Sequence, residues 1–201
     1  MSIEVIEAIE IIDVIEIVEH LKLFQPVKTL LLIDAYAMIY RAYYAFIRAP
    51  RMNSRGENTS AIFGFVVTLE DLIKRVKPSH LAVAFDPAGP TFRHEAFEQY
   101  KAQRQETPED IRWAVPRIKQ LLQAMNIPIL QVDGYEADDV IGTLAHQAEK
   151  EGFEVYMATP DKDYGQLVTE HVFMFRPRHT GGCEKMGPHE VGEKDGLQTQ
   201  A

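Results

Sequence analysis

Cysteine is almost absent from this sequence, since Cys183 is the only one among its 201 residues. A framework of disulfides is therefore excluded, and the composition suits a reducing cytosol, so we expect a cytoplasmic protein. The first residues lack the basic start, the apolar stretch and the small-residue cleavage site of a signal peptide. No run of 18 apolar residues occurs, so we also expect no segment that crosses a membrane.

Positively charged residues are also fewer than negatively charged ones. The chain has 21 Lys and Arg against 30 Asp and Glu, a net charge of −9, which on its face disfavours binding to nucleic acid. The acids are unevenly spread, because residues 1–28 hold six of them with two lysines and so contribute −4, leaving −5 for the remainder. A local basic stripe can coexist with this balance, so net charge alone does not identify a partner.

The first 24 residues place an acid at every third position from 4 to 19. In a helix a step of three turns about 300°, so these acids go round the whole circumference. In a strand they alternate between the two faces. Neither pattern leaves a face to bury. We interpret residues 1–28 as an acidic, repeat-like appendage to one globular domain over residues 29–201; the alternative is a frayed helix that docks on something.

Beyond the appendage, short apolar runs alternate with helical patterns. The runs typical of buried strands are KTLLLID, HLAVAFD, IPILQV, EVYMATPD and HVFMFRP. Helices are expected over about 36–47, about 60–77, about 108–125 and about 136–151. Thr59 or Ser60 is the expected cap of the second and Thr107 that of the third, whose apolar stripe runs from Ile111 to Met125. This alternation predicts an α/β fold, a mainly parallel twisted sheet with helices on both faces.

Four consecutive strands deliver carboxylates at their carboxyl ends, the edge where ligands bind in such sheets. The acids are Asp34, Asp86, Glu136, Asp138, Asp139, Asp161 and Asp163. Taken singly, each could be a turn former or a helix cap. Capping does not explain why seven gather at one edge, where like charges 4 Å apart repel by roughly 1–4 kcal/mol. We therefore expect cations to screen this rim.

Hard divalent cations suit the rim, because Mg²⁺ prefers oxygen ligands and keeps waters and phosphate oxygens in its shell. The Cys and His residues show no zinc spacing. Two ions about 3.5–4 Å apart activate a water and stabilise the leaving oxygen of a phosphodiester. The residues thus predict metal-assisted phosphodiester hydrolysis, whereas a sugar hydrolase would need two acids rather than seven.

A second motif, PTFRHEAFEQYKAQRQETPEDIR, interleaves cations with aromatic rings. Such a mixture suits a nucleic-acid strand, with cations for phosphates and rings for bases. Lys101 and Arg104 lie three apart and share one face if the segment is helical. The alternative is an ordinary solvated helix in which glutamates balance the cations.

At these residues the sequence resembles the 5′-3′ exonuclease domain of bacterial DNA polymerase I, within the flap-endonuclease superfamily of PIN-like folds. The match runs from about Thr29 to Gly196. Its motifs are LLIDAYAMIYRAYYAF, VAFDPAGPTFRHEAFEQYKAQR, GYEADDVIGTLA and TPDKDYGQLV. Ala35 departs from the family, which usually has Gly at that position.

The resemblance implies a role for each candidate site residue. A first Mg²⁺ or Mn²⁺ would be held by Asp34, Asp86, Glu136 and Asp138. A second would be held by Asp161 and Asp163, with Asp138 or Asp139 nearby. Lys101 and Arg104 would be catalytic residues at the scissile phosphate, and the expected DNA-binding residues are Tyr40, Arg41, Arg93 and Tyr100.

Family members cut DNA, and often RNA such as primers, from 5′ ends and at flap junctions, so we expect a monomer with this activity and allow for fusion to a polymerase domain. The family's last acidic motif and its helix-hairpin-helix module do not appear in the sequence. We therefore expect a C-terminally truncated domain with an incomplete second metal site. The alternative is a catalytically weak or inactive nucleic-acid-binding fragment of a longer exonuclease or polymerase. An interaction module unrelated to catalysis explains neither motif.

Because the first 24 residues offer no face to bury, deleting them should leave the free energy of unfolding almost unchanged. Chemical denaturation of the full and shortened chains measures the difference. A loss of more than about 1–2 kcal/mol, the scale of a typical damaging point mutation, would mean that the appendage docks on the domain.

Overall fold

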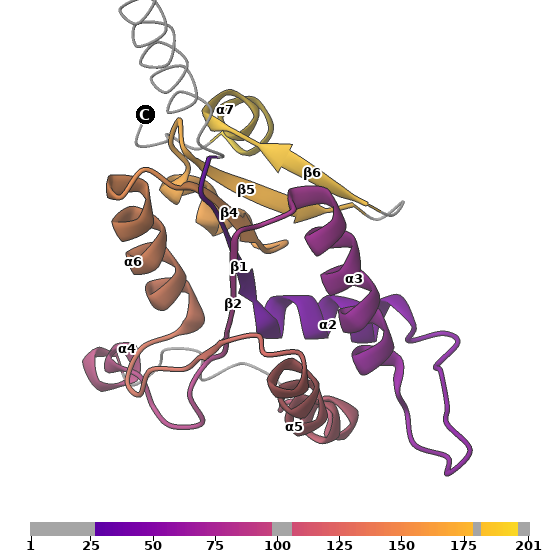
Figure 1. Ribbon diagram of the computed structural model, residues 1–201. Coiled ribbons are helices and arrows are strands. Elements are labelled where there is room, and N and C mark those ends of the chain that lie inside the picture. Colours follow the sequence, from indigo (N-terminus) through magenta and orange to yellow (C-terminus); the bar gives the residue numbers. More distant parts are fainter. Residues whose placement is uncertain (1–26, 98–105, 179–181, 197–201) are drawn as a thin grey trace, which may run out of the picture.

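The computed structural model describes residues 27–97, 106–178 and 182–196. In this part of the chain, six strands form one sheet in the order β3-β2-β1-β4-β5-β6 (Figure 1). The strands are β1 (Thr29–Asp34), β2 (His80–Ala84), β3 (Ile129–Leu130), β4 (Glu154–Ala158), β5 (Val172–Pro177) and β6 (Cys183–Met186). All neighbouring pairs are parallel except β5 with β6. The predicted mainly parallel sheet is confirmed.

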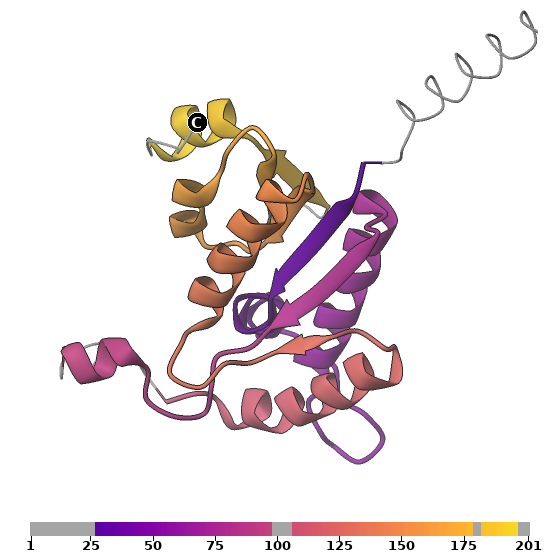
Figure 2. The same ribbon diagram turned by 60° about the vertical axis from the view of Figure 1, so that its left-hand side comes forward.

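Helices cover both faces of the sheet. They are α2 (Ala35–Ala45), α3 (Ser60–Val76), α4 (Phe92–Ala96), α5 (Glu109–Ala124), α6 (Ala137–Lys150), the 3₁₀ helix η1 (Lys162–Leu167) and α7 (Pro188–Asp195). Figure 2 shows α6 on one side of β1 and β2 and α3 on the other. No helix in the described ranges is long and apolar enough to cross a membrane.

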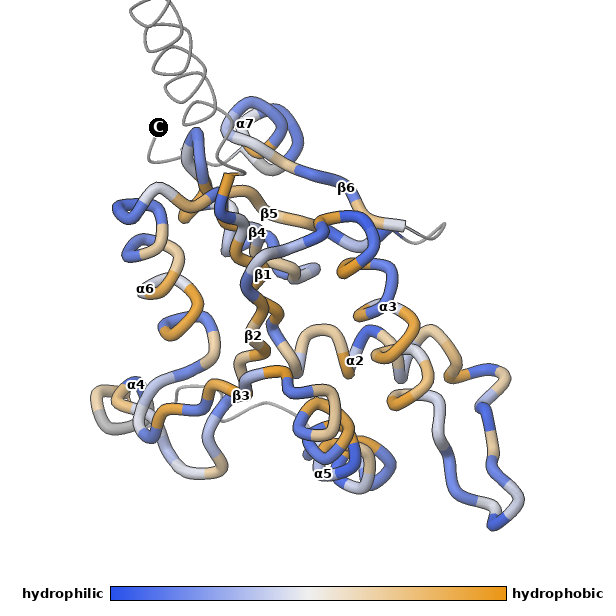
Figure 3. Tube along the Cα trace, viewed as in Figure 1, coloured by the Kyte–Doolittle hydropathy of each residue, from blue (hydrophilic) through white to orange (hydrophobic). Residues whose placement is uncertain are grey.

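Strand β1 is buried on both faces because its successive side chains enter two different cores. Leu31 and Ile33 pack in the core shared with α2, α3 and α5, whereas Leu32 packs in the core shared with α6. Alternation with period two requires this division. The apolar run of this strand therefore lies at the centre of the molecule, where Figure 3 shows the hydrophobic segments gathered.

Helix α5 differs from its predicted form at both ends. Its N-cap is Pro108 rather than Thr107, and the Thr107 hydroxyl instead accepts a hydrogen bond from the Tyr40 hydroxyl at 3.0 Å. The helix ends at Ala124, so Met125 lies past the apolar stripe and is 49% exposed. The expectations for Thr107 and Met125 were therefore wrong.

Other boundaries follow simple backbone rules. Helix α3 begins after Thr59, as predicted, but the Thr59 hydroxyl makes no cap and donates to the carbonyl of Arg51. It ends at Val76, two residues before Pro78. Strand β3 is shorter than its apolar run, while β6 and α7 were not expected from the sequence.

Helices α2 and α3 approach closely at Gly64, where an added Cβ would lie 2.7 Å from the Cβ of Ala42. Gly64→Ala should therefore lower the free energy of unfolding by about 1–3 kcal/mol, the usual cost of overpacking. Gly192→Ala in α7 is the control, because nothing lies within 4 Å of its added Cβ. That change should be neutral or stabilise by about 0.5–1 kcal/mol through helix propensity. Equal effects of both changes in denaturant titrations would contradict the close approach.

Candidate metal centre and nucleic-acid interface

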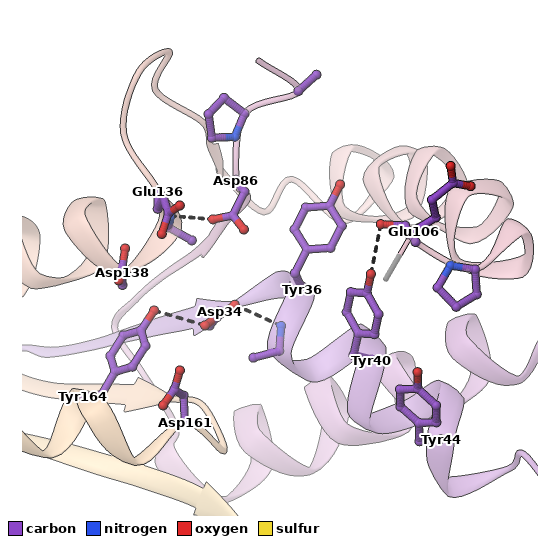
Figure 4. A pocket seen from close by; sticks show the side chains of 16 residues that line it. Asp34, Tyr36, Tyr40, Tyr44, Asp86, Glu106, Glu136, Asp138, Asp161 and Tyr164 are labelled. Carbon is purple, nitrogen blue, oxygen red and sulfur yellow. Dashed lines mark hydrogen bonds between the residues drawn. The ribbon is translucent and has the colours of Figure 1, made fainter. Parts of the chain in front are cut away.

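The carboxyl ends of the three central strands bring the predicted acids to one edge of the sheet. Asp34 ends β1 and pairs in register with Ala84, so Asp86 lies just beyond it on the neighbouring strand. On the other side Ile33 pairs with Ala158, which places Asp161 beyond the end of β4. Glu136 and Asp138 reach the same edge from the start of α6 (Figure 4).

These five acids line a cavity of about 710 Å³. Its other walls come from the aromatic face of α2, the turn after β2, the start of α5 and the 3₁₀ helix. The remaining lining residues are Tyr36, Ala37, Tyr40, Tyr44, Pro87, Ala88, Glu106, Thr107, Pro108, Ala137 and Tyr164. The five acids therefore lie on one side of the cavity, opposite a row of tyrosines beside which Glu106 lies (Figure 4).

At this rim the carboxylate of Asp34 is held in one orientation by hydrogen bonds. It accepts hydrogen bonds from the Ala37 amide and the Tyr164 hydroxyl, both at 3.1 Å. Burial raises the pKa of Asp34 to about 6, against the effect of these hydrogen bonds, and the charges of Asp86 and Asp161 raise it further. A nearby cation would relieve this penalty by favouring the ionised form.

The start of α6 holds Asp86 by a hydrogen bond and carries Glu136 and Asp138 itself. The Ala137 amide donates to Asp86 at 2.7 Å, which ties the end of β2 to this helix. Glu136, the N-cap, is only 6% exposed. Burial raises the pKa of Asp138, and the charge of Asp139 adds to the effect. The dipole of α6 favours acids at this end, but it does not remove their mutual repulsion.

A second, smaller cavity of about 320 Å³ adjoins the first, because Asp138, Asp161 and Tyr164 line both. Asp139 and Asp163 line only the smaller one. The structure thus brings all seven predicted acids to two adjoining cavities, with Asp138 and Asp161 in the shared wall.

The capping alternative also describes part of the geometry. Asp34 caps α2, Asp161 caps η1, and Asp139 accepts a hydrogen bond from the Glu136 amide at the start of α6. These capping bonds engage one oxygen of each carboxylate, and all three side chains also line one or both cavities. The two interpretations therefore apply to the same side chains.

The donor set fits hard divalent cations in chemistry, because every acidic ligand candidate offers oxygen and neither cavity is lined by His or Cys. Within the described residues, no three such side chains already surround a single point. Backbone amides and an arginine hold several of the carboxylates instead. A cation would have to draw the oxygens inward from the walls.

Of the residues predicted to bind DNA or to act in catalysis, some line the cavities and others do not. Tyr40 lines the larger cavity, whereas Arg41 donates to the carbonyl of Arg178 at 2.6 Å and lines neither cavity. Arg93 lines the smaller cavity and is paired with Asp139. Tyr100, Lys101 and Arg104 lie outside the described residues, and their roles stay predictions.

Sequence reasoning missed four residues that shape the site. Tyr36 and Tyr44 flank Tyr40 at helical spacing and line the same cavity; the period of four was a usable signal. Tyr164 and Thr159 both donate to Asp34, at 3.1 and 3.4 Å. They lie 130 and 125 residues away from it in the sequence, so no local pattern indicated this contact.

A mainly parallel sheet with a carboxylate rim at the carboxyl ends of its strands places the chain among α/β proteins that bind ligands at this edge. Residues 29–196 match the family described as the 5′-3′ exonuclease, N-terminal resolvase-like domain. The chain belongs to this family, as its motifs indicated.

Several relatives are DNA polymerases I. That of Chloroflexus aurantiacus is 47% identical over 76% of this chain, and that of Bacillus caldotenax is 42% identical over 85%. The 5′-3′ exonuclease of Aquifex aeolicus is 38% identical over 87% of the chain. The matches span only 16%, 19% and 58% of those relatives, respectively.

Solved structures support the fold independently. The bacteriophage T5 5′-exonuclease with bound zinc ions gives a TM-score of 0.63 at 19% identity, over 86% of this chain and 62% of that one. A T5 flap endonuclease in complex with DNA and metal ions gives 0.59 at 17% identity, over the same shares. Both neighbours hold bound metal ions.

Mg²⁺ should raise the thermal midpoint, and more so at about pH 7.5 than at about pH 5.5. Without metal, the raised pKa of Asp34 means that its protonated form favours the fold, and this contribution is lost as pH rises through about 6. A bound cation reverses the preference by holding Asp34 ionised. At 100 times its dissociation constant, such a ligand adds about 2.7 kcal/mol.

Melts in EDTA and in millimolar Mg²⁺ at both pH values measure this effect. Asp34→Asn, which cannot ionise, should lose most of the pH dependence of the Mg²⁺ response. Identical midpoints with and without metal at the higher pH would refute the metal centre.

Proposed function

We propose that this chain is a metal-dependent 5′-3′ exonuclease and flap endonuclease that hydrolyses DNA phosphodiesters. The observation that carries the proposal is the set of seven carboxylates around two adjoining cavities, in a chain of the 5′-3′ exonuclease family. Capping places some of these acids, but it does not explain why seven gather at one edge, where each adds repulsion. Mg²⁺ or Mn²⁺ is the expected cofactor.

The residues divide between two cation positions. Asp34, Asp86, Glu136 and Asp138 would hold the first, on the larger cavity, and Asp161 with Asp163 would hold part of the second. When bound, such ions supply an activated water and stabilise the leaving oxygen of a phosphodiester. The protein's own contribution is orientation: Tyr164 holds Asp34, and the start of α6 holds Asp86.

The tyrosine row on α2 supports a nucleic-acid strand as the occupant of the larger cavity. The ring centroids of Tyr36 and Tyr40 lie 6.5 Å apart, and those of Tyr40 and Tyr44 lie 6.4 Å apart in a stacked arrangement. Tyr44 is 54% exposed, which leaves aromatic surface for a base. Stacking of a base on an aromatic ring contributes roughly 1–3 kcal/mol.

The relatives support the finer parts of the proposal. One T5 neighbour is a complex with DNA, and several curated relatives are DNA polymerases I. Action on 5′ ends and flaps, on RNA in primers, and as a monomer, alone or fused to a polymerase, belongs to this proposal. So does a cytoplasmic location, which the single cysteine supports.

Asp86→Ala should abolish Mg²⁺- or Mn²⁺-dependent cleavage of 5′-tailed duplex DNA, because it removes a ligand of the first cation. Lys101→Ala should lower kcat more than metal affinity, since its predicted role is to stabilise developing phosphate charge. Glu70→Ala is the matched control: Glu70 is an exposed acid on α3 that pairs with Lys74 and lines neither cavity. It should cleave like the parent.

Gel assays with end-labelled DNA measure these rates. Cleavage by Asp86→Ala at the parent rate would make the activity a contaminant and the site assignment wrong. Binding of the tailed DNA without any metal-dependent cleavage would favour the nucleic-acid-binding fragment instead.

A further inference from the structure

Arg93 and Asp139 form a two-pronged ion pair across the smaller cavity. The guanidinium reaches the carboxylate with both terminal nitrogens, Nη1 to Oδ2 at 2.6 Å and Nη2 to Oδ1 at 2.8 Å. Two parallel charge-assisted bonds fix direction as well as distance. The side chains are 27% and 20% exposed, so water screens the pair less than one on the surface.

The carboxylate of Asp139 has little capacity left for another partner. Besides Arg93, its Oδ2 accepts a hydrogen bond from the Glu136 amide at 3.1 Å. Its neighbour Asp138 is 47% exposed, lines both cavities, and accepts a hydrogen bond from the Asp139 amide. Two adjacent acids on one helix turn are thus prepared for different partners.

Arg93 lies on α4, and this short helix is docked on the loop that leads into α6. The Phe92 amide donates to the carbonyl of Gly134 at 3.0 Å, and the Phe92 ring packs on Tyr135 at 5.6 Å. The guanidinium of Arg93 lies 4.8 Å from the same Phe92 ring. The ion pair with Asp139 is the charged part of this docking contact, beside the first turn of α6.

Arg93 also acts as a resident positive charge in the acidic rim. Its Nη1 lies 3.8 Å from Glu136 Oε2 and 3.9 Å from Asp138 Oδ1, beyond the distance of a good hydrogen bond but close enough for attraction. It therefore offsets part of the repulsion among these acids, and it opposes an incoming cation.

We propose that Asp139 is the anchor of Arg93 rather than a metal ligand, and that Arg93 is a positioning residue that fixes α4 against the start of α6. The metal-binding part of this proposal rests on the proposed function. Both residues thereby take roles other than those expected from the family resemblance. In the sequence, α4 is followed within ten residues by Lys101 and Arg104.

Four single variants of the full chain and one double variant separate the roles, with Mg²⁺ alone as the ligand. Asp139→Asn keeps an acceptor for the Glu136 amide but loses the charge, and Asp138→Asn is its matched neighbour. Arg93→Gln removes the positive charge of the side chain. Arg93→Lys keeps that charge but cannot make the two parallel hydrogen bonds of a guanidinium. The readouts are the Mg²⁺ dependence of the thermal midpoint and the hydrogen exchange of residues 88–97, both without DNA.

Asp138→Asn should weaken Mg²⁺ binding by roughly tenfold or more, whereas Asp139→Asn should change it by about twofold at most. Arg93→Gln should tighten Mg²⁺ binding by roughly two- to tenfold, because an opposing charge is gone. Arg93→Gln and Asp139→Asn should each speed hydrogen exchange of 88–97, and the double variant should exchange no faster than either. Arg93→Lys should keep the parent's Mg²⁺ affinity but exchange faster.

Equal weakening of Mg²⁺ binding by Asp139→Asn and Asp138→Asn would make Asp139 a ligand and overturn the proposal. Unchanged exchange of 88–97 in both the Arg93→Gln and Asp139→Asn variants would overturn the positioning role. If the parent itself shows no Mg²⁺ response, the proposed function fails, and the exchange data still decide whether the ion pair holds α4.

Discussion

Repulsion among carboxylates at one edge of a parallel sheet is the constraint on which this structure depends. Parallel strands end on the same side, so acids that follow β1, β2 and β4 must share a small volume. The protein manages this charge with backbone amides, the hydroxyls of Tyr164 and Thr159, and one guanidinium. These donors come from the β4–η1 region, from α4 and from the start of α6, so the fold and the site are stabilised by the same contacts.

The candidate ligands line the walls of two cavities, and among the described residues no three of them surround a single point. Backbone amides donate to Asp34 and Asp161 and keep these two carboxylates at the cavity walls. The two cavities share Asp138 and Asp161, so a cation bound in one cavity would interact electrostatically with the carboxylates of the other. The metal-dependent chemistry proposed for this family would therefore depend on carboxylates that follow three strands and on those at the start of one helix.

Much of this could be predicted from sequence, for identifiable reasons. Strand β1 is apolar on both faces, and the acids follow strands whose periodicity is clear, so the sheet and its rim were readable locally. Strand β6 has the sequence CEKM, which offers no alternation, and only pairing with β5 makes it a strand. The ion pair of Arg93 and Asp139 joins residues 46 apart in sequence, and a charge pattern alone does not reveal such a partner. Met125 was misassigned because an apolar stripe does not show where its helix ends.

The two outer strands of the sheet are its shortest, with two residues in β3 and four in β6. A sheet edge exposes unpaired amides and carbonyls in proportion to its length, and long free edges recruit strands from other molecules. Here the long strands are internal, and the polar residues of β6 occupy one border. The fold therefore offers little template for strand addition, which suits a protein whose hydrophobic strands would otherwise be prone to aggregate.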